Sequence, residues 1–176
     1  MCLLSLSLTG CRNPTETATV PEAADIESAR AEVLDFLYSI SGRQTLSGQH
    51  NREPNSDPAR WTQFIEAQTG RVPALWSGDF LFQRDNIEHR WTMIHEAERQ
   101  WQQGAVVNLM LHTCPPDKGE PCGWDPGVIN DLLSEAQWTE LITAGSPLNT
   151  AWKVRLDSVA VYLQYLQEQG VAVLFR

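Results

Sequence analysis

Several features that mark nucleic-acid, metal and nucleotide sites are absent from this 176-residue sequence. Its 13 Lys and Arg residues are outnumbered by 22 Asp and Glu, and the net charge of −9 excludes the basic surface of a typical nucleic-acid-binding protein. None of the four cysteines forms a CxxC pair, and no glycine-rich phosphate loop occurs. His95 and Glu96 begin like a metalloprotease motif, but the second histidine is missing. The sequence therefore implies no metal and no organic cofactor.

No apolar run approaches the ~18 residues that a transmembrane helix needs. Residues 1–11 read MCLLSLSLTGC and are similar to the end of a bacterial lipoprotein leader, so we expect Cys11 to be lipidated after cleavage. The protein would then be exported, as a cell-envelope lipoprotein or a secreted protein, with a lipid anchor as its contact with the membrane. The leader is incomplete, because no Lys or Arg precedes the apolar run, and a frayed apolar terminus is the alternative. Residues 12–24 lack periodicity and are predicted to be a flexible tether.

Short apolar stretches alternate with helical patterns in the domain at residues 25–176, which is typical of an α/β fold with a parallel sheet. The predicted strands are Thr45–His50, Val72–Phe80, Val106–His112 and Val171–Arg176. The predicted helices are Ile26–Ile40, Asp57–Gly70, Ile87–Trp101, Asp131–Ile142 and Leu148–Leu166. An open doubly wound sheet and the first half of an eight-stranded (β/α)8 barrel both fit this alternation. The missing phosphate loop makes the doubly wound sheet the weaker of the two.

Two polar residues stand where ligand-binding groups are found in parallel sheets, at the carboxyl ends of strands. His112 ends the third predicted strand, and Asp79 lies at the end of the second. A buried histidine with a neighbouring hydrogen-bond partner and a loop or capping aspartate are the structural alternatives. Cys114 and Cys122 bracket a short loop rich in Pro and Gly, where a disulfide is expected if the chain is exported.

Several segments in this order and spacing resemble glycoside hydrolase family 26, the β-mannanase-type enzymes, over Arg30–Arg176. The matching segments are TLSGQH at 45–50, PALWSGDF at 73–80, VNLMLH at 107–112, NTAWK at 149–153 and GVAVLFR at 170–176. The resemblance implies a (β/α)8 TIM barrel, here its N-terminal half of about four βα units. It also implies retaining hydrolysis of β-1,4-mannan or a related β-glycan. The family's acid/base glutamate lies in a Pro-x-His-Glu segment just after the fourth strand, and its nucleophile glutamate lies on the seventh.

The resemblance also assigns substrate-binding roles to residues of this chain. His112 would donate to a sugar hydroxyl beside the cleaved bond, and Trp124 would stack on a pyranose ring, with loop packing as the alternative for Trp124. Asp79 would bind hydroxyls or orient a neighbour. Gln49 and His50 would lie on the same rim, and Arg176 would point toward the catalytic carboxylates. A Cys114–Cys122 disulfide would hold the rim around Trp124.

Two classes of function fit the sequence. One is an exported mannanase-type hydrolase acting on polysaccharide, present here as a half that lacks both catalytic glutamates. The other is a non-catalytic glycan-binding lipoprotein or an inactive truncated product. In both cases we expect the 176 residues alone to be hydrolytically inert. We also expect them to form a dimer, an aggregate or a molten state, because a half-barrel leaves two strand edges unpaired.

Overall fold

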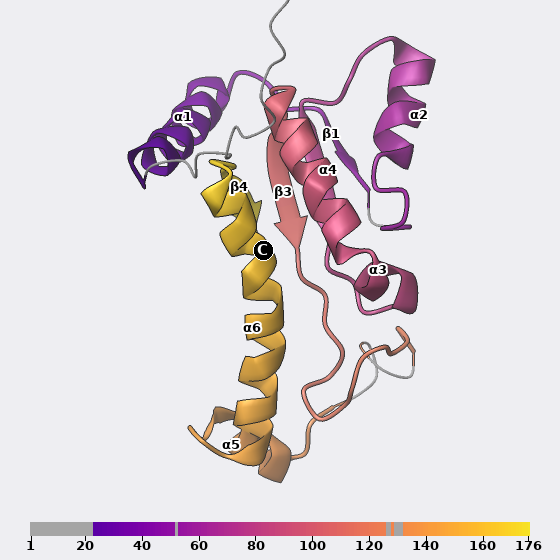
Figure 1. Cartoon of the computed structure of the whole chain (residues 1–176), viewed down its shortest axis with the longest axis vertical. Helices are drawn as coiled ribbons and strands as arrows, with labels where there is room; N and C mark the ends of the chain where they lie inside the picture. Colours follow the sequence, from indigo (N-terminus) through magenta and orange to yellow (C-terminus); the bar gives the residue numbers. More distant parts are fainter. Residues whose placement is uncertain (1–22, 52, 126–127, 129–131) are drawn as a thin grey trace, which may run out of the picture.

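The computed structural model describes residues 23–51, 53–125, 128 and 132–176 of the chain. These residues form one four-stranded parallel sheet with helices between the strands (Figure 1). The strands are β1 (Gly48–His50), β2 (Leu75–Asp79), β3 (Val106–Met110) and β4 (Val173–Phe175). The helices are α1 (Ala23–Ile40), α2 (Arg60–Thr69), α3 (Arg84–Glu88), α4 (Arg90–Gln102), α5 (Glu135–Ile142) and α6 (Pro147–Glu168). None of these helices is long and apolar enough to cross a membrane.

The strand order β1-β2-β3-β4 follows the order of the chain. A doubly wound sheet reverses direction at a switch point, whereas a (β/α)8 barrel adds each strand on the same side of the last. The order therefore favours the barrel over the open doubly wound sheet. In the described part of the chain β1 pairs only with β2, and β4 pairs only with β3.

One face of the sheet forms the main hydrophobic core with α4 and α6. Trp76 and Val107 are fully buried on this face, against residues such as Met93 of α4 and Leu166 of α6. Gly78 of β2 lies close to α4, because a Cβ there would come within 2.9 Å of Met93 Sδ and within 2.7 Å of the Trp76 ring. Only glycine fits this position without a shift of its neighbours.

A second, smaller cluster lies at the amino ends of the strands. There Val33 of α1 packs with Val106 and Ala172, and partly buried residues such as Leu75 and Leu174 pack against them. Figure 1 shows α1 beside this end of the sheet, away from the end toward which the β3 arrow points. Helix α1 thus covers the end of the sheet where the strands begin.

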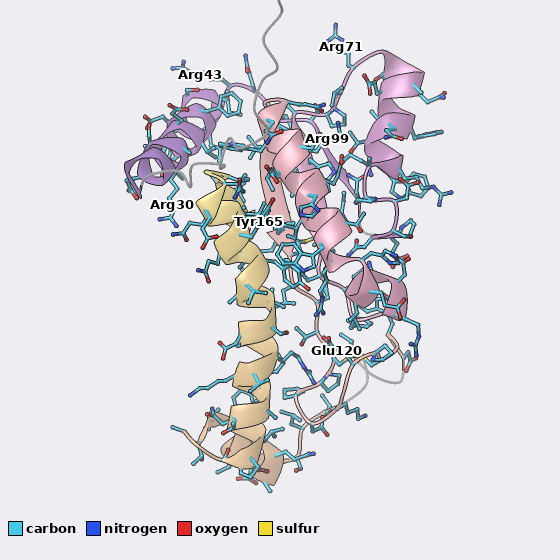
Figure 2. The ribbon with its side chains drawn as sticks, in the orientation of Figure 1. Arg30, Arg43, Arg71, Arg99, Glu120 and Tyr165 are labelled. Carbon is cyan, nitrogen blue, oxygen red and sulfur yellow. A yellow bond between two sulfur atoms is a disulfide. The ribbon has the colours of Figure 1, made fainter. Side chains whose placement is uncertain are left out.

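Helices α4 and α6 also contact each other through aromatic and polar side chains. Trp91 of α4 packs against Tyr162 at 4.7 Å and Tyr165 at 5.3 Å between ring centroids. The Tyr165 hydroxyl donates a hydrogen bond of 2.8 Å to Glu98, and Figure 2 shows Tyr165 between the two helices. This contact ties the helices that cover the core face of the sheet.

The predicted elements are correct in kind, but several boundaries are wrong. The predicted helix Ile87–Trp101 is divided at His89, whose φ of −113° and ψ of 25° are not helical. The predicted helix Asp131–Ile142 corresponds to α5, which begins only at Glu135. A capping box sets this start, because the Ser134 side chain accepts from the Gln137 backbone N–H and the Gln137 side chain accepts from the Ser134 backbone N–H. Helix α1 begins at Ala23, inside the predicted tether. The predicted leader at 1–11 with Cys11, and the rest of the tether, lie outside the described residues.

Candidate functional site

The carboxyl ends of the first three strands place three polar side chains next to one another. His50 ends β1, Asp79 ends β2, and His112 follows β3 by two residues. Pairing continues past β3, because Leu111 N–H donates to the Arg176 carbonyl at 3.0 Å. His112 is therefore held at the sheet edge although it lies outside the strand. His50, Asp79 and His112 together form the rim cluster.

Asp79 is the fully buried centre of the rim cluster. Its Oδ2 lies 2.7 Å from Nδ1 of His112 and 3.7 Å from Nε2 of His50. The side chains of the two histidines remain 39% and 35% exposed, respectively. A carboxylate only accepts hydrogen bonds, so His112 carries its proton on Nδ1 and presents Nε2 to the open side of the sheet. Asp79 thus fixes the orientation of the partly exposed His112 ring.

A row of hydrogen bonds across the barrel-facing side of the sheet fixes the second histidine. Asn108 Nδ2 donates to the Leu174 carbonyl at 2.8 Å, which turns its Oδ1 toward Ser77. The Ser77 hydroxyl donates to that Oδ1 at 3.0 Å, and its oxygen therefore accepts from Nδ1 of His50, also at 3.0 Å. The row gives His50 a protonated Nδ1 and one orientation. Gly48, Met110 and Arg176 line a hollow of about 350 Å³ together with residues of this row.

Trp124 lies beside the rim cluster. Its ring meets His112 edge-on, with 5.6 Å between centroids and planes at 66°, and packs against the buried Phe82 at 4.8 Å. The indole is only partly buried, so part of it remains open to solvent. The segment before it, here named the disulfide loop (Cys114–Cys122), is closed by a disulfide with 5.9 Å between the Cα atoms.

Two of the predicted site residues make other contacts. The Gln49 amide donates to the carbonyl of His50 in its own strand at 2.8 Å. Arg176 lies at the exposed end of β4, where its Nε is 2.8 Å from Met110 Sδ. The structure thus brings His50, Asp79, His112 and Trp124 together, while Gln49 and Arg176 lie on the same rim and bond elsewhere.

Sequence reasoning missed the residues that support the rim. Ser77 and Asn108 interrupt apolar strands, and a polar side chain inside such a run was the available signal. Asn55 is fully buried and donates to the Asp79 carbonyl at 3.0 Å. Arg90, which pairs with Glu120, and Arg155, which donates to the carbonyl of Cys114, carried no signal in the sequence.

The chemistry of the site is hydrogen bonding and stacking. Two oriented imidazoles and a partly open indole suit a polyhydroxylated ligand, since sugars present hydroxyls at their edges and an apolar ring face. Asp79 is hydrogen-bonded to His112 and lies 3.7 Å from Nε2 of His50, which suits it to orient His112. No group of three His, Cys, Asp or Glu able to hold a metal ion occurs among the described residues.

Comparison with known proteins decides the family. Residues 22–176 match the sequence profile of glycosyl hydrolase family 26. The chain belongs to this family. A mannan endo-1,4-beta-mannosidase of Thermothelomyces thermophilus is 29% identical over 156 residues, which are 85% of this chain and 30% of that protein. The predicted family is confirmed.

Solved structures confirm the predicted fold of family 26. The structure of GH26A from Muricauda sp. MAR_2010_75 superposes with a TM-score of 0.75 at 31% identity, over 84% of this chain and 47% of that one. A beta-mannanase from a symbiotic protist of the termite Reticulitermes speratus, complexed with gluco-manno-oligosaccharide, gives a TM-score of 0.69 at 21% identity, over 85% and 48%. The chain thus spans less than half the length of these relatives. Its sheet and helices are part of a (β/α)8 barrel.

Proposed function

We propose that this chain takes part in the hydrolysis of β-1,4-mannan and carries the sugar-binding rim contributed by the first four βα units of a mannanase barrel. The relatives named mannan endo-1,4-beta-mannosidase support the substrate class. The observation that carries the proposal is the position of Trp124 beside His112, whose orientation Asp79 fixes. A pyranose would stack on the indole while Nε2 of His112 bonds to one of its hydroxyls.

The catalytic carboxylates are proposed to come from other parts of the barrel. Retaining cleavage needs two carboxyl groups about 5–5.5 Å apart, one as acid/base and one as nucleophile. The family resemblance assigns them to a segment just after the fourth strand and to the seventh strand. We therefore propose that the 176 residues alone bind mannan without cleaving it, and that Arg176 borders the catalytic carboxylates in a complete barrel.

Export through a lipoprotein leader with lipidation at Cys11 is part of the same proposal. Disulfides persist in oxidising compartments and are rare in the cytosol. The disulfide between Cys114 and Cys122 supports an exported protein, as does a polysaccharide substrate too large to enter a cell.

A second candidate is a non-catalytic glycan-binding protein that uses the same rim. The hydrogen bond of the buried Asp79 to His112, with His50 on its other side at 3.7 Å, favours binding over cleavage at this site. The two candidates differ in whether a complete barrel containing these residues releases reducing ends from mannan.

Affinity electrophoresis tests the shared prediction of mannan binding. The chain is run through native gels with and without galactomannan, with Trp124→Ala beside it and Trp138→Ala as a control for loss of an exposed tryptophan on α5. We expect galactomannan to retard the wild type and Trp138→Ala, and not Trp124→Ala. Equal mobility of all three in both gels would contradict the proposal. Reducing-end release from soluble mannan by the wild type, abolished in Asp79→Ala, would make Asp79 catalytic and overturn the assignment of carboxylates elsewhere.

A further inference from the structure

The disulfide loop sets the distance between the two residues proposed to hold a sugar. His112 stands two residues before Cys114, and Trp124 stands two residues after Cys122. Because the disulfide brings the two ends of the loop to a Cα separation of 5.9 Å, it also brings the imidazole and the indole to 5.6 Å between centroids. The geometry of the His112–Trp124 pair therefore depends on how the loop is held.

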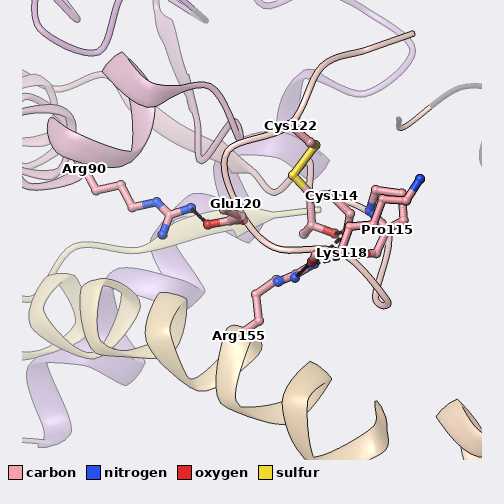
Figure 3. Close-up of a disulfide and its surroundings, with 8 residues drawn as sticks. Arg90, Cys114, Pro115, Lys118, Glu120, Cys122 and Arg155 are labelled. Atoms are coloured by element: carbon pink, nitrogen blue, oxygen red, sulfur yellow. Dashed lines mark hydrogen bonds and ion pairs between the residues drawn. A yellow bond between two sulfur atoms is a disulfide. The ribbon is translucent and has the colours of Figure 1, made fainter. Parts of the chain in front are cut away.

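Arg155 of α6 holds the first half of the loop. Its guanidinium donates to the carbonyls of Cys114 at 2.8 Å and Pro115 at 3.2 Å, and also to the carbonyl of Lys118 (Figure 3). A guanidinium presents five N–H donors in a rigid planar fork, so one side chain serves three carbonyls that turn toward it. A lysine at this position would keep the charge and lose the fork.

Arg90 of α4 holds the second half. Its Nη2 lies 3.1 Å from Oε2 of Glu120, and the two side chains are only 7% and 16% exposed. Figure 3 shows Arg90 and Arg155 reaching the disulfide loop from two different helices. Loss of one partner of such a buried ion pair leaves the other charge uncompensated. The loop is therefore attached to both helices that cover the core face of the sheet.

We propose that Arg155 is a positioning residue for sugar binding, which acts by holding the disulfide loop so that Trp124 faces a ligand beside His112. This inference rests on the proposed function for its ligand. The indole is pre-organised before the sugar arrives, and binding then costs less conformational entropy. Arg155 itself does not touch the sugar.

The first test needs no ligand. Hydrogen exchange of backbone amides 113–125 is measured for the wild type, Arg155→Met, Arg155→Lys and the control Arg84→Met, which removes an exposed guanidinium paired with Glu88. We expect faster exchange across these amides in Arg155→Met, partial restoration in Arg155→Lys and no change in Arg84→Met. Unchanged exchange in Arg155→Met overturns the positioning role, whatever the chain binds.

The second test is a double-mutant cycle with mannohexaose, followed by tryptophan fluorescence at low protein concentration. Arg155→Met should weaken binding about fivefold in the wild-type background and cause no further loss in the Trp124→Phe background, because residues that act as a unit are not additive. Equal losses in both backgrounds would overturn the action through Trp124. If exchange responds as expected but the wild type does not bind mannohexaose, the proposed function fails and the anchoring of the loop stands.

Discussion

Asp79 and His112 lie 33 residues apart in the sequence and meet with 2.7 Å between Oδ2 and Nδ1. The carboxylate is fully buried, whereas the imidazole side chain is 39% exposed. This pairing places a buried carboxyl group behind a partly exposed histidine. The proposed binding of sugar hydroxyls depends on that orientation.

Asp79→Asn keeps the shape of the side chain and removes its charge. We expect mannohexaose binding to weaken about tenfold, since a hydrogen bond to a charged group contributes about 1.5–3 kcal/mol. Asp157→Asn, an exposed aspartate on α6, is the matched control for loss of one negative charge. Fluorescence titration compares the two, and equal affinities in wild type and Asp79→Asn would show that the carboxylate does not orient the site.

Ser77→Ala breaks the row of hydrogen bonds that orients His50. The substitution leaves His50 Nδ1 and Asn108 Oδ1 without the hydroxyl that joins them, and we expect a loss of about 1–3 kcal/mol in the free energy of unfolding. Ser39→Ala removes an exposed hydroxyl that bonds within α1 and should change stability little. Urea unfolding measures both, and similar midpoints for the two variants would count against a structural row.

The hydrogen bond from Tyr165 to Glu98, together with burial, raises the pKa of Tyr165 above its ordinary value of 10.0. Because the folded pKa lies above the unfolded one, this stabilisation is fully present below pH 10 and is lost as the pH rises through the folded pKa. We expect the free energy of unfolding to fall more steeply with alkaline pH in the wild type than in Tyr165→Phe. Parallel curves in urea unfolding at increasing alkaline pH would contradict the shift.

Much of the fold follows from patterns that act locally. Apolar runs that end in polar residues located all four strands, and helical periodicity located the helices around them. The polar strand ends also identified Asp79 and His112, because parallel strands bring their carboxyl ends to one edge. Trp124 entered through the family resemblance, and its distance from His112 is set by the disulfide two residues away.

The contacts that hold the disulfide loop could not be predicted, because they join segments that are distant in the sequence. Arg155 bonds to the carbonyl of Cys114 across 41 residues, and Arg90 pairs with Glu120 across 30. From the sequence alone, an arginine on a helix is expected to be a solvent-exposed charge, and only the packing of that helix shows otherwise. The division of the predicted helix Ile87–Trp101 at His89 could not be predicted from the sequence, because the helical spacing of apolar residues continues through it.

The edge strand β4 leads us to expect self-association of the isolated 176-residue polypeptide. In the described part of the chain it pairs on one side only, and Phe175 is 47% exposed. Unpaired apolar strands associate edge to edge, and a charge within the strand opposes this. We expect sedimentation to show concentration-dependent association that Phe175→Lys reduces, whereas a monodisperse wild-type monomer at high concentration would contradict the half-barrel account.

Site-resolved oxidation of tryptophan tests the central claim, sugar binding on Trp124, most directly. The chain is treated with N-bromosuccinimide alone, with mannohexaose and with α-linked maltohexaose, and peptide mass spectrometry then reports each tryptophan. Trp61, Trp91 and Trp138 are 39%, 44% and 55% exposed and serve as controls within the same molecule. The account predicts that mannohexaose slows oxidation of Trp124 and of no control tryptophan, and that maltohexaose does not. Oxidation of Trp124 at one rate in all three conditions would contradict it.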